Sequence, residues 1–289
     1  MLFHVTGANG LVGKEVVSAL SALGEVRGTD VGDMDVTDFD AVKKDFEKSP
    51  PDVVVHLAGI KGNLPSRERP LLFFGVNTMG TLNLLEASRL AGVKHFIFFS
   101  SLTVHGPVEA EVNEDSPLNP QHPYSGSKGA GESMVSAYAN GFGMRGTNLR
   151  PNFIVGPIPA PLKIEDNLVY DFIDLCKKGE PIRVAGHGQY EREWMHPKDV
   201  AKAVALAAST PGEGCQTYIL RGERVTMQQF AERIVKHVGQ GSVTTNPDMG
   251  GFSIISSGEK AKRELGFEAE IDLDSVIAEV WAEYQVRHG

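Results

Sequence analysis

The sequence LFHVTGANGLVG, residues 2–13, joins an apolar run to three glycines with the spacing G-x-x-G-x-x-G. The run at residues 2–6 predicts a strand, and the apolar spacing over residues 10–23 predicts a helix. Glycines in a strand-to-helix turn permit a tight bend and let a pyrophosphate approach the backbone N–H groups at the positive helix end. This context indicates a dinucleotide site; an ordinary turn with incidental glycines is the alternative. The residues expected at the dinucleotide are Gly7, Asn9, Gly10, Leu11, Val12 and Gly13.

Short β-type runs and helical patterns alternate over the first two-thirds of the chain, which is the signal of parallel βαβ units. Further strands are predicted at residues 25–28, 53–57, 95–100 and 147–150, and helices at 39–48, 80–90 and 127–140. After Pro151 come loops rich in proline and glycine (Gly156, Pro157, Pro159, Pro161) around shorter elements. There we predict helices at 167–178, 197–209, 227–238 and 273–285, and a strand at 216–220.

The predicted fold class is α/β: a doubly wound parallel sheet (Rossmann fold) with a smaller α/β C-terminal substrate lobe. Ligands of such sheets bind at the carboxyl ends of the strands, so we expect the lobe to cover that edge. The dinucleotide-binding domain is assigned to residues 1–155, joined by about 195–220. The substrate-binding lobe is assigned to residues 156–194 and 221–289.

Composition narrows the class of protein. Of 289 residues, 41% are hydrophobic and 22% are charged, which is ordinary for a globular protein. The formal net charge of −9 argues against nucleic acid or an anionic membrane as partner. Cys176 and Cys215 have no metal-ligand spacing, and we predict no metal. The apolar start reaches Gly7 too early for a signal peptide, and no stretch has membrane-spanning length, so a cytoplasmic location is expected.

Asp30 ends the second predicted strand, where a carboxylate can accept hydrogen bonds from the adenosine ribose. Its charge would repel a 2′-phosphate, so NAD is favoured over NADP as the cofactor. A plain loop aspartate is the alternative. Other positions expected on the cofactor side, each with a packing role left open, are Asp35, Val36, Leu57, Ala58, Gly59 and Asn77.

Tyr124 and Lys128 are one helical turn apart in the sequence YSGSK. A tyrosine with an ordinary pKa of about 10 is a poor base at neutral pH. A nearby ammonium group and the positive nicotinamide ring of bound NAD⁺ lower that pKa. Tyr124 could then take the proton of a substrate hydroxyl, while Lys128 could also bind the nicotinamide ribose. Ser101, with Thr103 sharing the task, would orient the same oxygen; an exposed Tyr and a solvated Lys are the alternative.

At these residues the chain resembles the extended short-chain dehydrogenase/reductases, specifically the NAD-dependent epimerase/dehydratase branch that acts on nucleotide sugars. The resemblance covers nearly the whole chain and implies a homodimer paired through the helices at 80–90 and 127–140. The sequence carries it at residues 7–13, Asp30, 56–59, 100–106, 124–128, 149–151, 186–188, 192–201 and 265–267.

Two departures from the family pattern bear on the reaction. The sugar 4,6-dehydratases of this family have an Asp-Glu pair directly after the catalytic Ser or Thr. This chain has Leu102 and Thr103 at those positions, so a dehydratase is not expected. The pattern is similar to that of the 4-epimerases, although His105 replaces their usual Tyr. Phe153 stands where the family has Asn, with Asn152 one residue earlier.

The resemblance also implies substrate contacts. Arg192 matches a position that often binds the nucleotide diphosphate in the sugar enzymes of this family, and a planar guanidinium suits a diphosphate. An ion pair of Arg192 with Glu193 or Asp199 is the alternative. Asn167 could face the nucleotide or cap a helix. The substrate-binding residues predicted are Ser101, Asn152, Asn167 and Arg192.

We therefore expect an NAD-dependent epimerase that acts on a small molecule, a nucleotide sugar, through a transient keto intermediate. The alternative is an NAD-dependent dehydrogenase or reductase of a sugar, a uronate or another secondary alcohol, with the same catalytic residues. A scaffold protein without turnover is a third reading; such proteins tend to lose the Tyr or the Lys, and both are present here.

Overall fold

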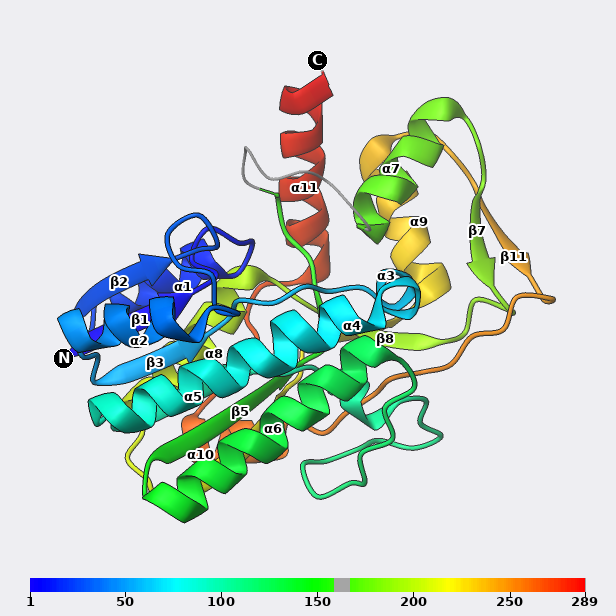
Figure 1. Ribbon diagram of the computed structural model, residues 1–289. Helices are drawn as coiled ribbons and strands as arrows, with labels where there is room; N and C mark the ends of the chain where they lie inside the picture. The colour runs from blue at the N-terminus through cyan, green and yellow to red at the C-terminus, as the bar shows by residue number, and fades with distance from the viewer. Residues whose placement is uncertain (159–166, 289) are drawn as a thin grey trace.

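A six-stranded parallel sheet forms the centre of the molecule, as the computed structural model of residues 1–158 and 167–288 shows (Figure 1). The predicted loop prolines Pro159 and Pro161 lie outside the described residues. The strand order is β2-β1-β3-β4-β5-β9, and every neighbouring pair is parallel. The strands are β1 (Leu2–Thr6), β2 (Glu25–Thr29), β3 (Val53–His56), β4 (His95–Phe99), β5 (Arg145–Pro151) and β9 (Cys215–Leu220).

The chain leaves β1 in one direction to form β2 and then crosses to the other side of β1 to form β3. This reversal places a switch point between β1 and β3, the position at which doubly wound sheets bind ligands. The α/β class and the doubly wound parallel sheet are thus confirmed.

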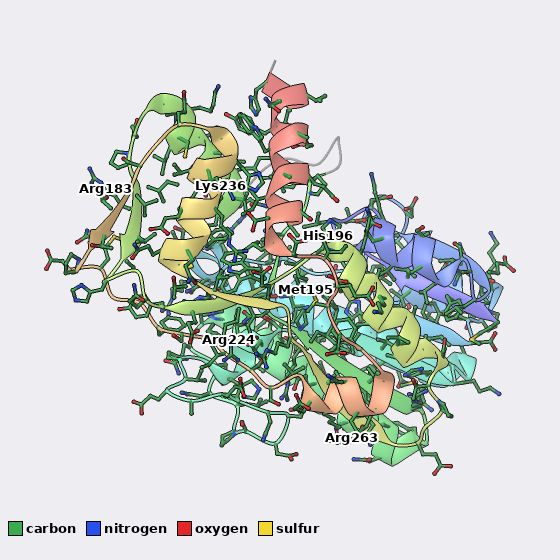
Figure 2. All side chains as sticks on the ribbon, turned by 180° about the vertical axis from the view of Figure 1, so that it is seen from behind. Arg183, Met195, His196, Arg224, Lys236 and Arg263 are labelled. Carbon is green, nitrogen blue, oxygen red and sulfur yellow. The ribbon has the colours of Figure 1, made fainter. Side chains whose placement is uncertain are left out.

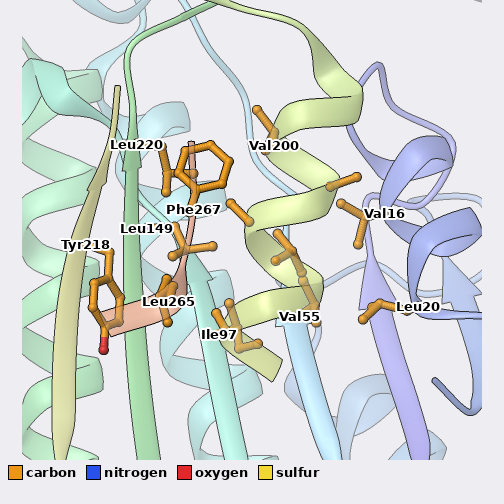
Figure 3. Close-up of a cluster of buried hydrophobic side chains, with 14 of the residues drawn as sticks. Val16, Leu20, Val55, Ile97, Leu149, Val200, Tyr218, Leu220, Leu265 and Phe267 are labelled. Atoms are coloured by element: carbon orange, nitrogen blue, oxygen red, sulfur yellow. The ribbon is translucent and has the colours of Figure 1, made fainter. Parts of the chain in front are cut away.

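Helices cover both faces of the sheet, and successive strand side chains supply the two cores by pointing to opposite faces. Val53 and Val55 belong to one core, and Val54 between them belongs to the other. The first core includes side chains from α1 (Gly13–Leu20), α8 (Pro197–Ser209) and α10 (Glu259–Leu265). Figure 3 shows it from α1 across the sheet to Tyr218, Leu220 and Phe267. The second core includes side chains from α2 (Phe39–Lys48), α5 (Gly80–Ala91) and α6 (Pro123–Phe142).

A separate core lies beside this sheet, at the upper right of Figure 1. It includes Trp194, whose ring stacks on that of Phe230 with centroids 3.8 Å apart. Figure 2 shows Met195 and His196 where β8 leads into α8, back at the main sheet. The strands here form the order β10-β8-β6 and the pair β11-β7. The elements are β6 (Phe153–Ile154), α7 (Leu168–Lys178), β7 (Ile182–Ala185), β8 (Glu191–Met195), β10 (Glu223–Thr226), α9 (Met227–Val238), β11 (Val243–Asn246) and α11 (Leu273–His288).

The structure corrects several predicted boundaries. The helix expected from residue 127 begins at Pro123, so Tyr124 lies inside α6. Proline suits the first helical position because it has no N–H to satisfy there. Sequence reasoning missed α3 (Asn63–Glu68), α4 (Pro70–Phe73), the π-helical turn η1 (Phe74–Met79) and the 3₁₀ turn η2 (Leu102–His105). Across residues 1–158 and 167–288, no helix is both long and apolar enough to span a membrane.

Three buried histidines make the stability of the sheet sensitive to acid. His4, His56 and His95 hydrogen-bond threonine hydroxyls at 2.8–3.0 Å. Burial lowers the pKa of each to about 3, from the 6.5 of an exposed histidine. The unfolded chain therefore binds protons below pH 6.5 that the folded chain does not bind, and each histidine should reduce stability by about 2 kcal/mol at pH 5.

We expect the melting temperature to fall steeply between pH 6.5 and pH 5, as scanning calorimetry would measure. The His95→Gln variant should show a shallower fall, because one of the three protonation sites is gone. A melting temperature that is constant between pH 7 and pH 5 would contradict this account.

Candidate active site

The glycine turn after β1 lies against the loop after β3. Gly7 has a φ of 71°, and a Cβ there would lie 2.8 Å from the Ala58 nitrogen. A Cβ on Gly13 would lie 2.1 Å from the Gly7 oxygen. Both positions therefore exclude side chains. Val12, at the N-cap of α1, makes no side-chain cap. The first N–H groups of α1 thus have no side-chain acceptor at the N-cap, and such groups bind phosphate well.

Asp30 follows β2 and lies at the glycine turn. One carboxylate oxygen accepts a hydrogen bond from Asn9 N at 3.0 Å, and the other accepts one from Val31 N at 2.9 Å. Asp35 is exposed and accepts bonds from the N–H and hydroxyl of Thr37. Its neighbour Val36 is buried, and its side chain meets Gly80 of α5. The structure thus brings Asp30 to the predicted phosphate turn and also gives Val36 a packing role.

Asn77 in η1 joins the loop after β3 to α6. Its amide oxygen accepts from Ile60 N at 2.9 Å, and its amide nitrogen donates to Ile60 O and to Ser127 Oγ, both at 3.0 Å. Asn77 is 1% exposed, so these bonds supply the structural role that the sequence left open. Within this loop, a Cβ on Gly59 would lie 2.9 Å from Asn77 Oδ1 and 3.6 Å from Lys128 Nζ.

Tyr124 and Ser101 meet at the carboxyl edge of the sheet. Ser101 follows β4, and its hydroxyl lies close enough to the phenol of Tyr124, in the first turn of α6, to lower the pKa of that phenol. Ser101 Oγ also lies 2.9 Å from Thr103 Oγ1, which brings the second hydroxyl to the same place. Burial raises the pKa of Tyr124, and the Ser101 hydroxyl opposes that rise. Positive charge nearby is therefore needed before Tyr124 can act as a base at neutral pH.

Lys128 lies one turn further along α6 and is almost fully buried. Its ammonium group donates to Phe99 O at 2.7 Å and lies 5.1 Å from the centroid of the Phe98 ring. Burial lowers the pKa of Lys128 to about 8, and the charge of Glu132 acts in the opposite direction. Lys128 thus stays mainly cationic at neutral pH, close to the point at which it loses its proton.

Behind these residues lies a buried polar network centred on Glu132. Arg150 donates to both carboxylate oxygens of Glu132, at 2.9 and 2.7 Å, and Ser100 donates its hydroxyl to the same carboxylate. Arg150 also contacts His105 Nε2 at 3.1 Å, and His105 Nδ1 lies 3.1 Å from Pro117 O. Burial and the charge of Arg150 lower the pKa of His105. His105 thus takes part in a structural network here.

Arg192 of β8 lies between two phenyl rings. Its guanidinium carbon is 5.5 Å from the centroid of Phe153 and 5.1 Å from that of Phe252. The group donates to the carbonyls of Glu191 and Phe252, and burial lowers the pKa of Arg192 to about 10.

The ion pair that we considered for Arg192 does not form. Glu193 binds Arg224 and Ser256, while Asp199 accepts from the N–H groups of Glu270 and Ile271. Within the described part of the chain, no salt bridge involves Arg192.

Two predicted substrate residues have structural partners. Asn152 donates its amide to Ile254 O at 3.0 Å and to Glu193 at 3.4 Å, while its Oδ1 is buried without a partner. Asn167 caps α7 by accepting from Val169 N at 3.2 Å, which is the alternative that the sequence had left open. A substrate contact by either residue stays a prediction. Over residues 1–158 and 167–288, no cluster of three or more His, Cys, Asp or Glu could hold a metal ion.

Comparison with known proteins assigns the family. The model of the NAD dependent epimerase/dehydratase family matches residues 3–220. The chain belongs to this family. The UDP-glucose 4-epimerase of Mycolicibacterium smegmatis is 28% identical over 305 aligned positions, which cover 95% of each chain. The dTDP-glucose 4,6-dehydratase of Streptomyces griseus is 30% identical over 81% of this chain and 71% of its own. The solved UDP-glucose 4-epimerase of Thermus thermophilus, in complex with NAD, has a TM-score of 0.86 at 26% identity over 99% of both chains.

The family is enzymatic and NAD-dependent, so NAD is the cofactor, as the sequence predicted. The residues present fit a dinucleotide. The turn at Gly7 and Gly13 has no room for side chains, and Val12 at the N-cap of α1 offers no side-chain acceptor to the first N–H groups of the helix. The comparisons do not separate epimerase from dehydratase, because relatives of both activities are similarly close.

Sequence reasoning missed several residues around the site. Phe73 and His122 contact the Tyr124 ring, and Phe252 contacts Arg192. His122 precedes Pro123, and a polar residue before a proline at the first helical position is a signal that could have identified it. Phe252 gives no such signal, because it lies 60 residues from Arg192 in the chain.

Proposed function

We propose that this protein is an NAD-dependent epimerase of a nucleotide sugar, with Tyr124 as the catalytic base. The observation that carries the proposal is the Ser101 hydroxyl beside the Tyr124 phenol at the carboxyl edge of the sheet, with Lys128 one helical turn away. These groups lie at the carboxyl edge of the sheet, and Lys128 lies near Gly59 in the loop that packs on the glycine turn.

In this proposal Ser101 binds the reacting sugar hydroxyl and holds its oxygen toward Tyr124, with Thr103 assisting. Tyr124 removes the proton of that hydroxyl as the carbon is oxidised to a ketone, and it returns the proton when the ketone is reduced on its other face. Bound NAD supplies the acceptor and then the donor of the hydride. Lys128 stabilises the phenolate form of Tyr124 by its charge and is placed to hold the nicotinamide ribose. Asp30 would bind the adenosine ribose.

The residues after Ser101 favour an epimerase over a dehydratase. Elimination of water from a sugar needs an acid and a base besides the hydride acceptor. Leu102 is fully buried against Val112, Ile219 and Ile254, and Thr103 offers only a hydroxyl that contacts Ser101. Neither residue can do the proton transfers of an elimination.

Arg192 is proposed to bind the diphosphate of the substrate. A half-buried guanidinium without a carboxylate partner is a strong site for such a group. We expect Arg192→Lys to raise KM about tenfold and to leave kcat nearly unchanged, because a single ammonium cannot make the bidentate contact. Steady-state kinetics, with UDP affinity from calorimetry, would measure this. Phe252→Leu is the matched control for the ring contact; an unchanged UDP affinity in Arg192→Lys would contradict the role.

A homodimer through α5 and α6 is also proposed. The two helices lie side by side in Figure 1, and Arg89 of α5 covers the ring of Phe142 of α6. Met79 and Leu90, three turns apart, are 49% and 52% exposed, and Phe142 is 58% exposed. Apolar side chains at this exposure on adjacent helices suit a second copy of the chain. The molar mass from light scattering tests this proposal.

The proposed reaction is tested by a proton NMR time course of the purified protein with NAD⁺ and a panel of UDP- and dTDP-sugars. A new anomeric signal without net NADH is the expected result. Equimolar NADH with an oxidised product would instead make the protein a dehydrogenase, and a 4-keto-6-deoxy product would make it a dehydratase.

A further inference from the structure

The residue that begins the catalytic helix is a histidine with two contacts to the site. His122 is the N-cap of α6, and its Nδ1 accepts a hydrogen bond from Ser125 N at 3.2 Å. In return, Ser125 Oγ accepts from His122 N at 3.3 Å, which completes a capping box. N-caps are usually Ser, Thr, Asp or Asn, none of which changes charge between pH 5 and pH 8.

The imidazole ring of His122 also lies parallel to the Tyr124 ring. The centroids are 6.0 Å apart with an interplanar angle of 7°, which is an offset-stacked geometry. Phe73 of α4 approaches the same tyrosine ring edge-on, with centroids 6.4 Å apart at 85°. Tyr124 thus has one ring beside it from its own helix end and another from a separate helix, while its hydroxyl lies beside Ser101.

We propose that His122 is a positioning residue for Tyr124, and that only its neutral form holds the tyrosine in place. The cap fixes the first turn of α6, on which Tyr124 lies, and the stacked ring limits rotation of the phenol away from Ser101. This proposal rests on the proposed role of Tyr124 as the base.

Protonation would remove the cap. Because Nδ1 accepts from Ser125 N, the proton of the neutral ring is on Nε2, and a second proton on Nδ1 leaves no acceptor. The new charge would also lie at the positive end of α6. The charged group that faces His122 from a neighbouring element is Arg67 of α3, which donates to Gln121 O at 3.0 Å. Burial, and then Arg67, lower the pKa of His122. The neutral, capping form therefore prevails at neutral pH and is lost below pH 6.5.

The test compares two variants that each keep one of the two contacts. His122→Asn keeps a good cap but has no stacking ring and does not titrate, whereas His122→Phe keeps a ring but cannot cap. We expect kcat at pH 7.5 to fall about tenfold in each variant with little change in KM, because a displaced base slows the chemical step and leaves substrate binding intact. The wild-type kcat should also fall in acid below pH 6.5 with a step that is absent from His122→Asn.

A second readout needs no substrate. The chain has six tyrosines, so NMR spectra of protein with labelled tyrosine rings can be assigned by difference with Tyr124→Phe. The Tyr124 ring signals of the wild type should shift with pH at the midpoint of His122, and those of His122→Asn should not.

Two results would overturn the proposal. The first is Tyr124 ring signals in the wild type that do not shift as His122 titrates. The second is a kcat and a pH profile in both His122 variants that equal those of the wild type, while Tyr124→Phe is inactive. An active Tyr124→Phe enzyme would instead remove the proposed base, while the NMR titration would still decide whether His122 holds the ring.

Discussion

The Tyr124→Phe variant is expected to lose about 10³-fold in kcat while it keeps its fold and its affinity for NAD. Phenylalanine removes the group that accepts the proton, and general-base catalysis contributes on this scale. The ring contacts to His122 and Phe73 can persist, because they do not involve the hydroxyl. The substitution does remove the interaction between the Tyr124 hydroxyl and Ser101. The NMR assay of sugar epimerisation measures the rate, and calorimetry measures the binding of NAD.

Tyr138→Phe is the matched control, since Tyr138 lies on the same helix and also donates its hydroxyl, to Glu86 at 3.1 Å. It should retain nearly full activity. Burial raises the pKa of Tyr124. Lys128→Met should be as inactive as Tyr124→Phe, because it removes the positive charge that we propose counteracts this rise. Near-normal turnover by Tyr124→Phe would exclude the tyrosine as the base.

The parts of the site that the sequence predicted are those encoded locally. The glycine turn and the run of three valines in β3 follow from short-range rules, because tight turns need glycine and strands buried on both faces are continuously apolar. The spacing of Tyr124 and Lys128 on one helix is equally local. The start of α6 lies four residues before the predicted one, since the proline at its first position is equally compatible with a loop.

The interactions that local patterns do not predict are those between residues distant in the chain. The sequence suggests Glu193 or Asp199 as partners of Arg192, yet the acid beside it binds Arg224 and Ser256. Alternation along a strand explains this, because Arg192 and Glu193 point to opposite faces. Which ring then covers Arg192 depends on how residues 250–256 pass β8, and no local pattern encodes that path. The same holds for Asn152, whose amide binds Ile254 O of that segment.

The Glu132→Gln variant should lose about 3–5 kcal/mol of unfolding free energy, because it leaves the buried guanidinium of Arg150 without its countercharge. Both side chains are 6% exposed. Arg150→Met should cost a similar amount, and the double variant should cost much less than the sum, because neither buried charge is then left alone. Urea denaturation measures these free energies. The control is Glu86→Gln on α5. Its pair with Arg89 has the same 2.7 Å separation but is about one-third exposed, so solvent screening should make its loss far less costly than that of the buried pair.

The same variant should change the pH dependence of catalysis. The charge of Glu132 raises the pKa of Lys128 against the effect of burial. Without that charge the pKa of Lys128 falls below about 8, so the ammonium that supports Tyr124 is lost at a lower pH. We therefore expect the alkaline limb of the pH profile of kcat to move toward neutral pH in Glu132→Gln. Two outcomes together would contradict this account: unfolding free energies of Glu132→Gln and Arg150→Met that simply add in the double variant, and an alkaline limb that does not move. They would show that Glu132 neither pairs with Arg150 nor acts on Lys128. Ser100, which follows β4 and precedes Ser101, also donates to Glu132. The carboxylate of Glu132 therefore joins the end of β4 to α6, the helix that carries Tyr124 and Lys128. For this reason its loss should affect both stability and catalysis.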